Sequence, residues 1–350
     1  MTAPLVLNVA FLLAGLILLY FGGDFLVSGA SGIARRLNIP VIVIGLTVVA
    51  FGTSAPELFV SLISAWKGLM PVSVGNVVGS NIINVALVLG LVSLVRPLPV
   101  TRKIALIDTP IMIGSALVLA LVVINFDGDA AGTAADAGTA TGAAAPYWQY
   151  GVITTLEGLV MVGLLVAYLY FLYRNANRSG AQSLEEIPID EIPVEPGAAM
   201  PLLFLKVIAG VAGLALGGQL LVDGASWIAE NIFGASQRFI GVTVVAFGTS
   251  LPELVTSLVA IVRGETDISL GNVVGSNIFN SLLVLGATSL LRNIEIGSSD
   301  FRIDFLFMVS VSVLLFVITA WKRKLPRWGG ASFFVIYIVY FVILLQTRTI

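Results

Sequence analysis

One stretch of this sequence occurs twice, and this duplication constrains the fold more than any other feature. Residues 45–90 and residues 241–286 share the blocks GTS-x-PE and GNVVGSNI-x-N. The offset between the copies is 196 residues throughout, and 29 of the 46 aligned positions are identical. Each copy places one glutamate, Glu57 or Glu253, within a strongly apolar segment. The chain therefore contains two related units, each with a carboxylate at the same place.

The composition predicts an integral membrane protein. Hydrophobic residues make up 58% of the chain and charged residues only 11%, whereas soluble domains carry about 25% charged residues. The apolar residues occur in runs of roughly 20, which is the length of a helix that spans a bilayer. The strict alternation typical of a membrane β-barrel is absent from the sequence. We therefore expect an all-α, multi-pass protein of the cell membrane, surrounded by the lipid bilayer.

The sequence predicts about ten transmembrane helices. The first is interpreted as a true span because it lacks the basic start of a signal peptide and its apolar run is too long for one. The ten candidate spans are residues 5–27, 40–65, 72–95, 104–125, 149–173, 201–222, 239–262, 268–291, 303–321 and 329–346.

The repeat extends over both halves of the chain. Gly22-Gly23 matches Gly217-Gly218, and Asp108 matches Asp304. Each half then has five spans, and because five is odd, the second half must enter the membrane in the opposite sense. We expect two inverted five-helix repeats, an architecture that places binding sites near the bilayer midplane where the repeats meet.

The predicted division of the chain follows from these spans and from two polar segments. The external loop is rich in Ala, Gly and Thr, and the cytoplasmic linker is acidic, contains prolines and lacks the spacing of an EF-hand. The divisions are residues 1–125 (spans one to four, with an ion-binding repeat at about 40–95), 126–148 (flexible external loop), 149–173 (span five), 174–200 (acidic cytoplasmic linker) and 201–350 (second repeat, with an ion-binding repeat at about 239–291).

The basic residues predict the orientation of the chain. Cytoplasmic loops of membrane proteins are enriched in Lys and Arg. With an external N-terminus, 13 of the 18 Lys and Arg residues fall on the cytoplasmic side and 5 on the external side. We therefore expect both the N-terminus and the C-terminus to be external.

The first block of each copy combines a carboxylate with a broken helix. Thr53 and Glu57 are four residues apart and share one helical face. Pro56 has no backbone N–H, so the carbonyl of Gly52 loses its helical donor and the helix should kink. The second copy repeats this arrangement around Pro252. In a membrane, such irregular backbone is tolerated where it is buried in protein or lines a cavity.

The available ligands predict a site for hard cations. The sequence has no cysteine and no histidine, so thiolate and imidazole ligands are excluded and zinc or copper is disfavoured. Carboxylates, hydroxyls, amides and carbonyls remain, and Ca²⁺ takes 6–8 such oxygens in irregular geometry. Two glutamates balance the charge of one Ca²⁺, Na⁺ fits the same oxygens, and an ionisable residue inside a membrane usually marks an ion pathway.

The paired blocks resemble the two repeat motifs of the calcium/cation antiporter superfamily, most closely those of the prokaryotic sodium/calcium exchangers. The resemblance implies that calcium is bound by Glu57, Glu253, Thr53 and Thr249. It implies that sodium is bound by the same two glutamates together with Ser54, Ser80, Ser250, Ser276, the carbonyl oxygens of Ala50 and Ala246, and the neighbouring Asn84 and Asn280. Its potassium-dependent members carry Asp at the position of Asn280, so we expect no potassium dependence.

The function implied is Ca²⁺/Na⁺ antiport by alternating access, in which spans one and six move across a core of spans two, three, seven and eight. Three Na⁺ on two glutamates would make exchange electrogenic, whereas two protons on the same pair would give the alternative, an electroneutral Ca²⁺/H⁺ antiporter. A channel is disfavoured because selectivity filters normally come from symmetric subunits. We expect neither an enzyme nor a cofactor, no nucleic-acid partner because no basic stripe is present, and a monomer as the functional unit.

Two of the acidic residues outside the duplicated blocks occupy equivalent places in the predicted spans. Asp108 and Asp304 are about one turn inside their spans. We expect them to cap a helix near the membrane interface or to pair with Arg102 and Arg302.

Overall fold

The computed structural model describes residues 2–37, 39–123, 150–179, 199–233 and 246–348. The predicted external loop and most of the predicted acidic linker lie outside the described residues. The start of the predicted seventh span, residues 239–245, also lies outside them.

The described part of the chain is almost entirely helical. The helices are α1 (Thr2–Arg36), α2 (Val41–Ile44), α3 (Ala50–Thr53), α4 (Ala55–Trp66), α5 (Met70–Ile82), α6 (Gly90–Val95), α7 (Thr109–Val123), α9 (Thr155–Ser179), α10 (Met200–Asn231), α12 (Ala246–Thr249), α13 (Leu251–Val262), α14 (Thr266–Phe279), α15 (Leu285–Leu291), α16 (Ser298–Lys322) and α17 (Arg327–Arg348). Four π-helical segments join some of them: Gly45–Val49, Ile83–Leu89, Ile104–Asp108 and Asn280–Val284. The strands are β1 (Leu98–Pro99), β2 (Tyr150–Ile153), β3 (Ile294–Gly297) and β4 (Lys324–Leu325).

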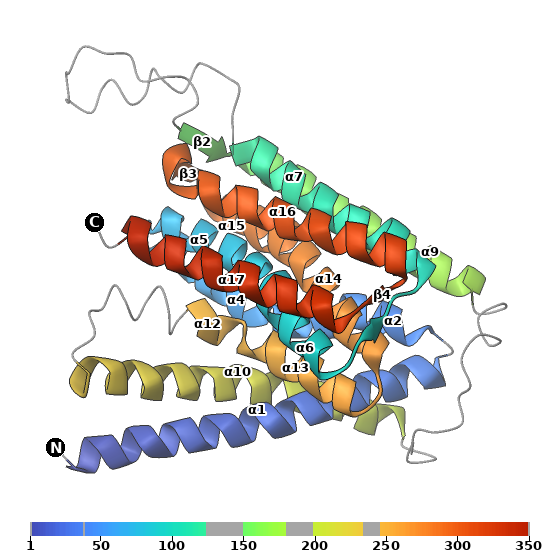
Figure 1. The fold of residues 1–350 in the computed structure, drawn as a ribbon, viewed down its shortest axis with the longest axis horizontal. Coiled ribbons are helices and arrows are strands. Elements are labelled where there is room, and N and C mark those ends of the chain that lie inside the picture. The colour runs from blue at the N-terminus through green and yellow to red at the C-terminus, as the bar shows by residue number, and fades with distance from the viewer. Residues whose placement is uncertain (1, 38, 124–149, 180–198, 234–245, 349–350) are drawn as a thin grey trace.

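Nine of the ten predicted spans have a counterpart among the described residues. Eight helices are long and apolar enough to cross a membrane, and a ninth span is the bent pair formed by residues 41–53 and 55–66. Of the predicted seventh span, the structure describes the short helix α12 and the apolar helix α13. The first turn of α1 and the last turn of α17 lie at the same end of the bundle (Figure 1).

Helices α1 and α10 lie side by side and antiparallel along one edge of the molecule (Figure 1). A Cβ atom on Gly22 would lie 2.7 Å from the backbone nitrogen of Leu214, and one on Gly210 would lie 2.5 Å from that of Leu26. Any larger side chain at these glycines would push the helices apart. Small residues therefore bring the two backbones together, as in other membrane helix pairs.

The centre of the bundle is built from the second block of each copy. The most apolar 18-residue windows of Val72–Val95 and Thr266–Leu291 are each 83% buried, compared with 22% for the windows in α1 and α17. These two central spans contain the Gly-Ser-Asn motifs. They are surrounded by the other helices, so their polar side chains face protein, not lipid.

The predicted kink is confirmed in the first half. Helix α3 ends at Thr53, Ser54 has φ −82° and ψ 2°, and α4 continues at an angle of 42°. In the second half Ser250 has φ −90° and ψ 3°, and it separates α12 from α13 in the same way. Pro56 and Pro252 each fall in the first turn of the following helix, where a missing N–H is tolerated.

Two short strand pairs connect the outer loops of the two halves. Strand β1 pairs with β4, with Leu98 opposite Leu325, and β2 pairs with β3, with Ile153 opposite Ile294. Leu98 and Ile294 are related by the offset of 196 residues, so the two ladders are equivalent. They lie at opposite ends of the bundle (Figure 1).

Candidate ion-binding site

The helix breaks place both glutamates in the interior of the protein. Glu57 and Glu253 lie in the first turns of α4 and α13, where exposed backbone N–H groups favour negative charge. Both side chains have an exposed fraction of 0%. Ser54, three residues before Glu57, donates a hydrogen bond to Glu253, so the two glutamates belong to one region of the interior. The structure therefore brings together two like charges that the sequence separates by 196 residues.

Each glutamate has one carboxylate oxygen with a hydrogen bond and one without. The Ser80 hydroxyl donates to Oε1 of Glu57 at 3.3 Å, and the Ser54 hydroxyl donates to Oε1 of Glu253 at 3.4 Å. The second oxygen, Oε2, is buried and has no hydrogen-bond partner in either residue. A buried carboxylate oxygen left in this way is strongly unfavourable unless a cation or a proton compensates it.

Two asparagines brace the glutamates, and sequence reasoning missed both. The Asn76 side-chain amide donates to the Glu57 carbonyl at 3.1 Å, and the Asn272 amide donates to the Glu253 carbonyl at 3.5 Å. Each also donates to a serine one turn beyond its glutamate. Both asparagines belong to the GNVVGSN block, which is identical in the two copies, as the glutamates are. This identity was the signal from which the sequence could have identified them.

The two threonines link the halves to each other. The Thr53 hydroxyl donates to Oδ1 of Asn272 at 3.0 Å, and the Thr249 hydroxyl donates to Oδ1 of Asn76 at 3.4 Å. Thr53 also lies 3.3 Å from the hydroxyl of Ser276. Each threonine thus contacts the asparagine that braces the glutamate of the other half. The predicted calcium residues therefore lie in two equivalent hydrogen-bond networks, one with Thr53 and Glu253 and one with Thr249 and Glu57, and each network joins the two halves.

Several of the predicted sodium residues lie in these two networks. The Ala50 carbonyl accepts bonds from the hydroxyls of Thr53 at 3.3 Å and Ser276 at 3.5 Å. It also accepts the backbone N–H of Ser54 at 3.0 Å. The Ser250 hydroxyl donates to Ser80 at 3.2 Å. Ala246 is the first described residue of its segment and begins α12.

The remaining two predicted residues lie in π-helical turns of the central spans. Asn84 lies in Ile83–Leu89 and Asn280 begins Asn280–Val284. The Asn84 amide donates to Oδ1 of Asn277 at 3.0 Å, whereas both polar atoms of the Asn280 side chain are buried without a partner. Single π-helical turns are frequent at functional sites, and here they mark the two amides.

The chemistry of this interior is restricted to oxygen ligands. It offers two carboxylates together with hydroxyls, amide oxygens and a shared carbonyl. Within the described part of the chain, no group of three or more acidic side chains could hold a metal ion. Two negative charges and neutral oxygens suit one divalent cation or monovalent cations.

Asp108 and Asp304 have tyrosine partners, which the sequence did not predict. The Tyr168 hydroxyl donates to Oδ1 of Asp108 at 3.3 Å, and the Tyr340 hydroxyl donates to Oδ1 of Asp304 at 2.7 Å. Both aspartates are buried. The apolar packing of α7 and α16 encloses them, which the position near the span ends does not reveal.

Comparisons with known proteins agree with this architecture. The model of the sodium/calcium exchanger protein family matches residues 7–174 and 202–346. The chain is 32% identical to the sodium/calcium exchanger MaX1 of Methanosarcina acetivorans, over 96% of this chain and 98% of that protein. It is 34% identical to the inner membrane protein YrbG of Escherichia coli, over 91% of this chain and 90% of that protein.

A solved structure shares the whole fold. The sodium-calcium exchanger NCX_Mj, soaked with 10 mM Na⁺ and no Ca²⁺, superposes with a TM-score of 0.77 at 31% identity, covering 97% of this chain and 99% of that chain. The family match, the full-length relatives and this structural likeness lead to one conclusion. The chain belongs to the sodium/calcium exchanger protein family.

Proposed function

We propose that this protein is an antiporter that exchanges Ca²⁺ for Na⁺ across the membrane by alternating access. The observation that carries the proposal is the pair of buried oxygens, Oε2 of Glu57 and Oε2 of Glu253, that have no hydrogen-bond partner. Burying an ionised carboxylate at the centre of a membrane helix costs about 3 kcal/mol on insertion scales. A bound cation offsets this for both residues at once.

Calcium is assigned to Glu57, Glu253, Thr53 and Thr249. Two carboxylates neutralise one Ca²⁺, and each threonine lies four residues before its glutamate, at the end of the helix that precedes the break. Both threonines contact the asparagine bracing the opposite glutamate. The four ligand side chains are therefore held in place by the two networks that join the halves.

Sodium is assigned to the hydroxyls and carbonyls that flank this position. The residues are Ala50, Ser54, Ser80, Asn84, Ala246, Ser250, Ser276 and Asn280, with the two glutamates shared between the ions. A shared ligand set makes binding of the two cations mutually exclusive, which is what exchange requires. MaX1 and NCX_Mj are both named sodium/calcium exchangers, which supports this choice of ions.

The two halves are assigned as inverted repeats around this site. The equivalent helices α1 and α10 pack antiparallel, with Gly22 against Gly210 and Gly15 against Gly217. Such close contact favours their movement as one unit across the core, which would expose the site first on one side and then on the other. With both termini at one end of the bundle, the distribution of basic residues assigns that end to the outside.

The alternative is Ca²⁺/H⁺ exchange through the same glutamates, because a proton could also occupy each partnerless oxygen. Uptake of radiolabelled Ca²⁺ into proteoliposomes separates the two. We expect uptake when an outward Na⁺ gradient is imposed, and none when a pH gradient is imposed without Na⁺. Uptake driven by the pH gradient alone would replace sodium with protons in the proposal.

A further inference from the structure

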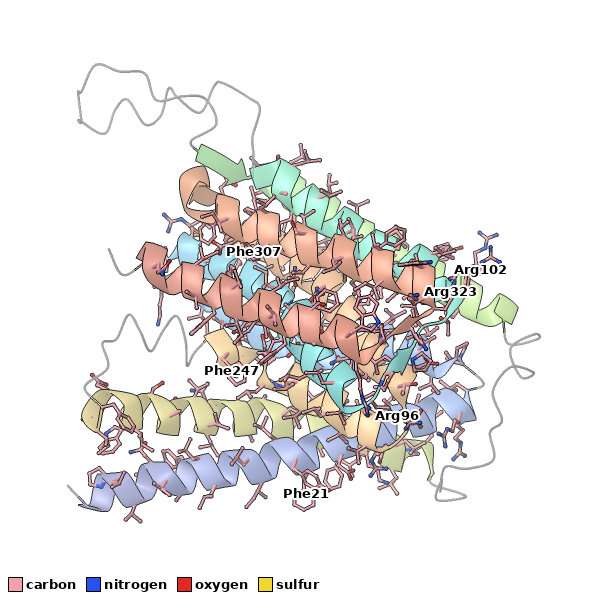
Figure 2. All side chains as sticks on the ribbon, viewed as in Figure 1. Phe21, Arg96, Arg102, Phe247, Phe307 and Arg323 are labelled. Carbon is pink, nitrogen blue, oxygen red and sulfur yellow. The ribbon has the colours of Figure 1, made fainter. Side chains whose placement is uncertain are left out.

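The two equivalent strand ladders differ sharply in charge. The β1–β4 ladder and its flanks carry six exposed basic residues, which we call the basic platform: Arg96, Arg102, Lys322, Arg323, Lys324 and Arg327. The sequence has no Asp or Glu between Glu57 and Asp108, and none after Asp304. Both segments that form the platform are therefore purely basic. Figure 2 shows Arg102 and Arg323 beside β4, at the same end of the bundle as Arg96.

The second ladder provides an internal control for this observation. Its register makes Arg323, Lys324 and Arg327 equivalent to Gly151, Val152 and Thr155. By the offset of 196 residues, Arg102 corresponds to Ser298, and Arg96 alone has a basic counterpart, in Arg292. The β2–β3 ladder also carries the acidic Glu295. The same scaffold is therefore basic at one end of the bundle and mixed at the other.

The platform lies where four spans end. Val95 ends the third span and Ile104 begins the fourth, while Lys322 and Arg327 border the last two spans. Basic side chains at these positions lie at the level of the lipid headgroups. Trp321 and Trp328 flank them with exposed fractions of 75% and 53%, and exposed tryptophans are typical of the membrane interface.

The backbone of the platform is held in an unusual conformation. Arg323 has φ 54°, and within the described residues it is the one residue other than glycine with a positive φ. Its N–H donates to the Thr319 carbonyl and its carbonyl accepts the Val100 N–H, both at 3.0 Å. Glycine normally occupies this position after a helix. The backbone conformation favours glycine at this position, but the sequence has an arginine, which adds a positive charge to the platform.

The charges of the platform are largely uncommitted within the protein. Ion pairs join Arg35 to Glu265 and Arg263 to Asp24, and neither includes a residue of the platform. Lys322 lies over the ring of Trp321 at 4.2 Å, and Arg327 donates to the Val95 carbonyl at 3.3 Å. These contacts orient the cations without neutralising them.

We propose that the basic platform is a binding surface for anionic phospholipid headgroups. The phosphates fit the forked guanidinium groups, the acyl chains would lie against the apolar ends of α16 and α17, and the two tryptophans would lie at the ester level. Clusters of 4–8 Lys and Arg beside a span are typical of anionic-lipid recognition. This inference does not depend on which ions the protein exchanges.

Quenching of the two flanking tryptophans tests the surface directly. A background with Trp66, Trp148 and Trp227 replaced by phenylalanine leaves Trp321 and Trp328 as the reporters. This protein is reconstituted in phosphatidylcholine containing a minor fraction of phosphatidylglycerol, with either the anionic or the zwitterionic lipid brominated. We expect the anionic lipid to quench severalfold more than its bulk fraction predicts, since each cation near an anionic surface contributes a preference of up to about fivefold.

Two variants separate the platform from general membrane attraction. Quenching by the anionic lipid should fall to the level expected from its bulk fraction in the triple variant Arg102→Gln/Arg323→Gln/Lys324→Gln. The double variant Arg102→Gln/Lys324→Gln keeps Arg323, the residue with positive φ, and should lose only part of the excess quenching. Arg292→Gln on the opposite ladder should leave it unchanged. Quenching in proportion to bulk composition in the unsubstituted platform, or equal quenching in all variants, would overturn the proposal.

Discussion

The two halves of the chain hold their glutamates in the same way, but they differ in the asparagines of the π-helical turns. Asn76 and Asn272 each donate to the carbonyl of their own glutamate. Asn84 donates to Asn277, whereas its counterpart Asn280 has a buried amide without a partner. The two glutamates and their bracing asparagines are thus the symmetric part of the site. The side-chain amides of Asn84 and Asn280 are its asymmetric part.

The halves also differ in how the long helices are tied to the core. Two ion pairs of 2.5 Å join α1 to the turn between α13 and α14: Arg35 with Glu265, and Arg263 with Asp24. The equivalent positions of the other half hold Glu230 with Leu69, and Lys67 with Gln219. The side chains at these equivalent positions cannot form the same ion pairs. The long helices are therefore tied to the core by different contacts at the two ends of the bundle.

The largest effect is expected from removing either charge of the symmetric part of the site. Glu57→Gln and Glu253→Gln should each lower calcium flux in proteoliposomes by more than the roughly 10–100-fold that is typical for groups that only orient a ligand. The two losses should be equal, because each variant leaves one carboxylate for a divalent ion.

A matched control for this comparison is Asp223→Asn, which also converts a carboxylate to an amide. Asp223 is exposed and accepts a hydrogen bond from Gln219, so this variant should retain flux. If either glutamate variant kept a flux close to that of the unsubstituted protein, the two glutamates would not be equivalent ligands.

Aspartate substitutions should reveal the asymmetry of the amides. Asn84→Asp loses the donor to Asn277 and places two oxygens 3.0 Å apart, so it should lower the free energy of unfolding by about 1–3 kcal/mol. Asn280→Asp breaks no such bond and should lower it less. Thermal unfolding of both variants in the same detergent measures the difference. Equal destabilisation would show that the added charge matters and the hydrogen bond does not.

Equivalent serines should have similar and smaller effects. Ser54→Ala and Ser250→Ala each remove one hydroxyl assigned to sodium. A lost hydrogen-bonding group of about 1 kcal/mol corresponds to a roughly fivefold increase in the sodium concentration for half-maximal exchange. Calcium–calcium exchange in the absence of sodium should be retained in both variants. An unchanged sodium dependence would remove these serines from the sodium set.

The smallest effect is expected from the ion pairs. They are partly exposed, and such pairs contribute about 0–1 kcal/mol. Asp24→Asn with Glu265→Gln should raise the rate at which an impermeant thiol reagent modifies a Thr256→Cys reporter from that end by about two- to fivefold. Gln219→Glu, which adds a carboxylate opposite Lys67, should not raise this rate. Equal rates with and without the ion pairs would show that they do not hold this end closed.

The sequence was sufficient to predict the features that repetition and hydropathy encode. Long apolar runs predicted the spans, and Pro56 predicted the break that the structure shows after Thr53. The identical offset predicted that Glu57 and Glu253 occupy equivalent places. These predictions succeed because lipid and proline restrict the backbone so strongly.

The sequence could not predict which side chains meet across the halves. The bond from Thr53 to Asn272 joins residues 219 positions apart, and its partner choice depends on how two broken helices cross. The tyrosine partners of Asp108 and Asp304 were missed for the same reason. Helical spacing identifies a face, whereas the packing of another span decides what that face contacts.

The number of calcium ions bound per chain tests the central claim most directly, because the account builds one site from both halves. Equilibrium binding of Ca²⁺ to the purified protein, with and without Na⁺, measures it. We predict one Ca²⁺ per chain, displaced by Na⁺, and none in either Glu57→Gln or Glu253→Gln. Two ions per chain, or one ion retained when a single glutamate is replaced, would contradict a shared site.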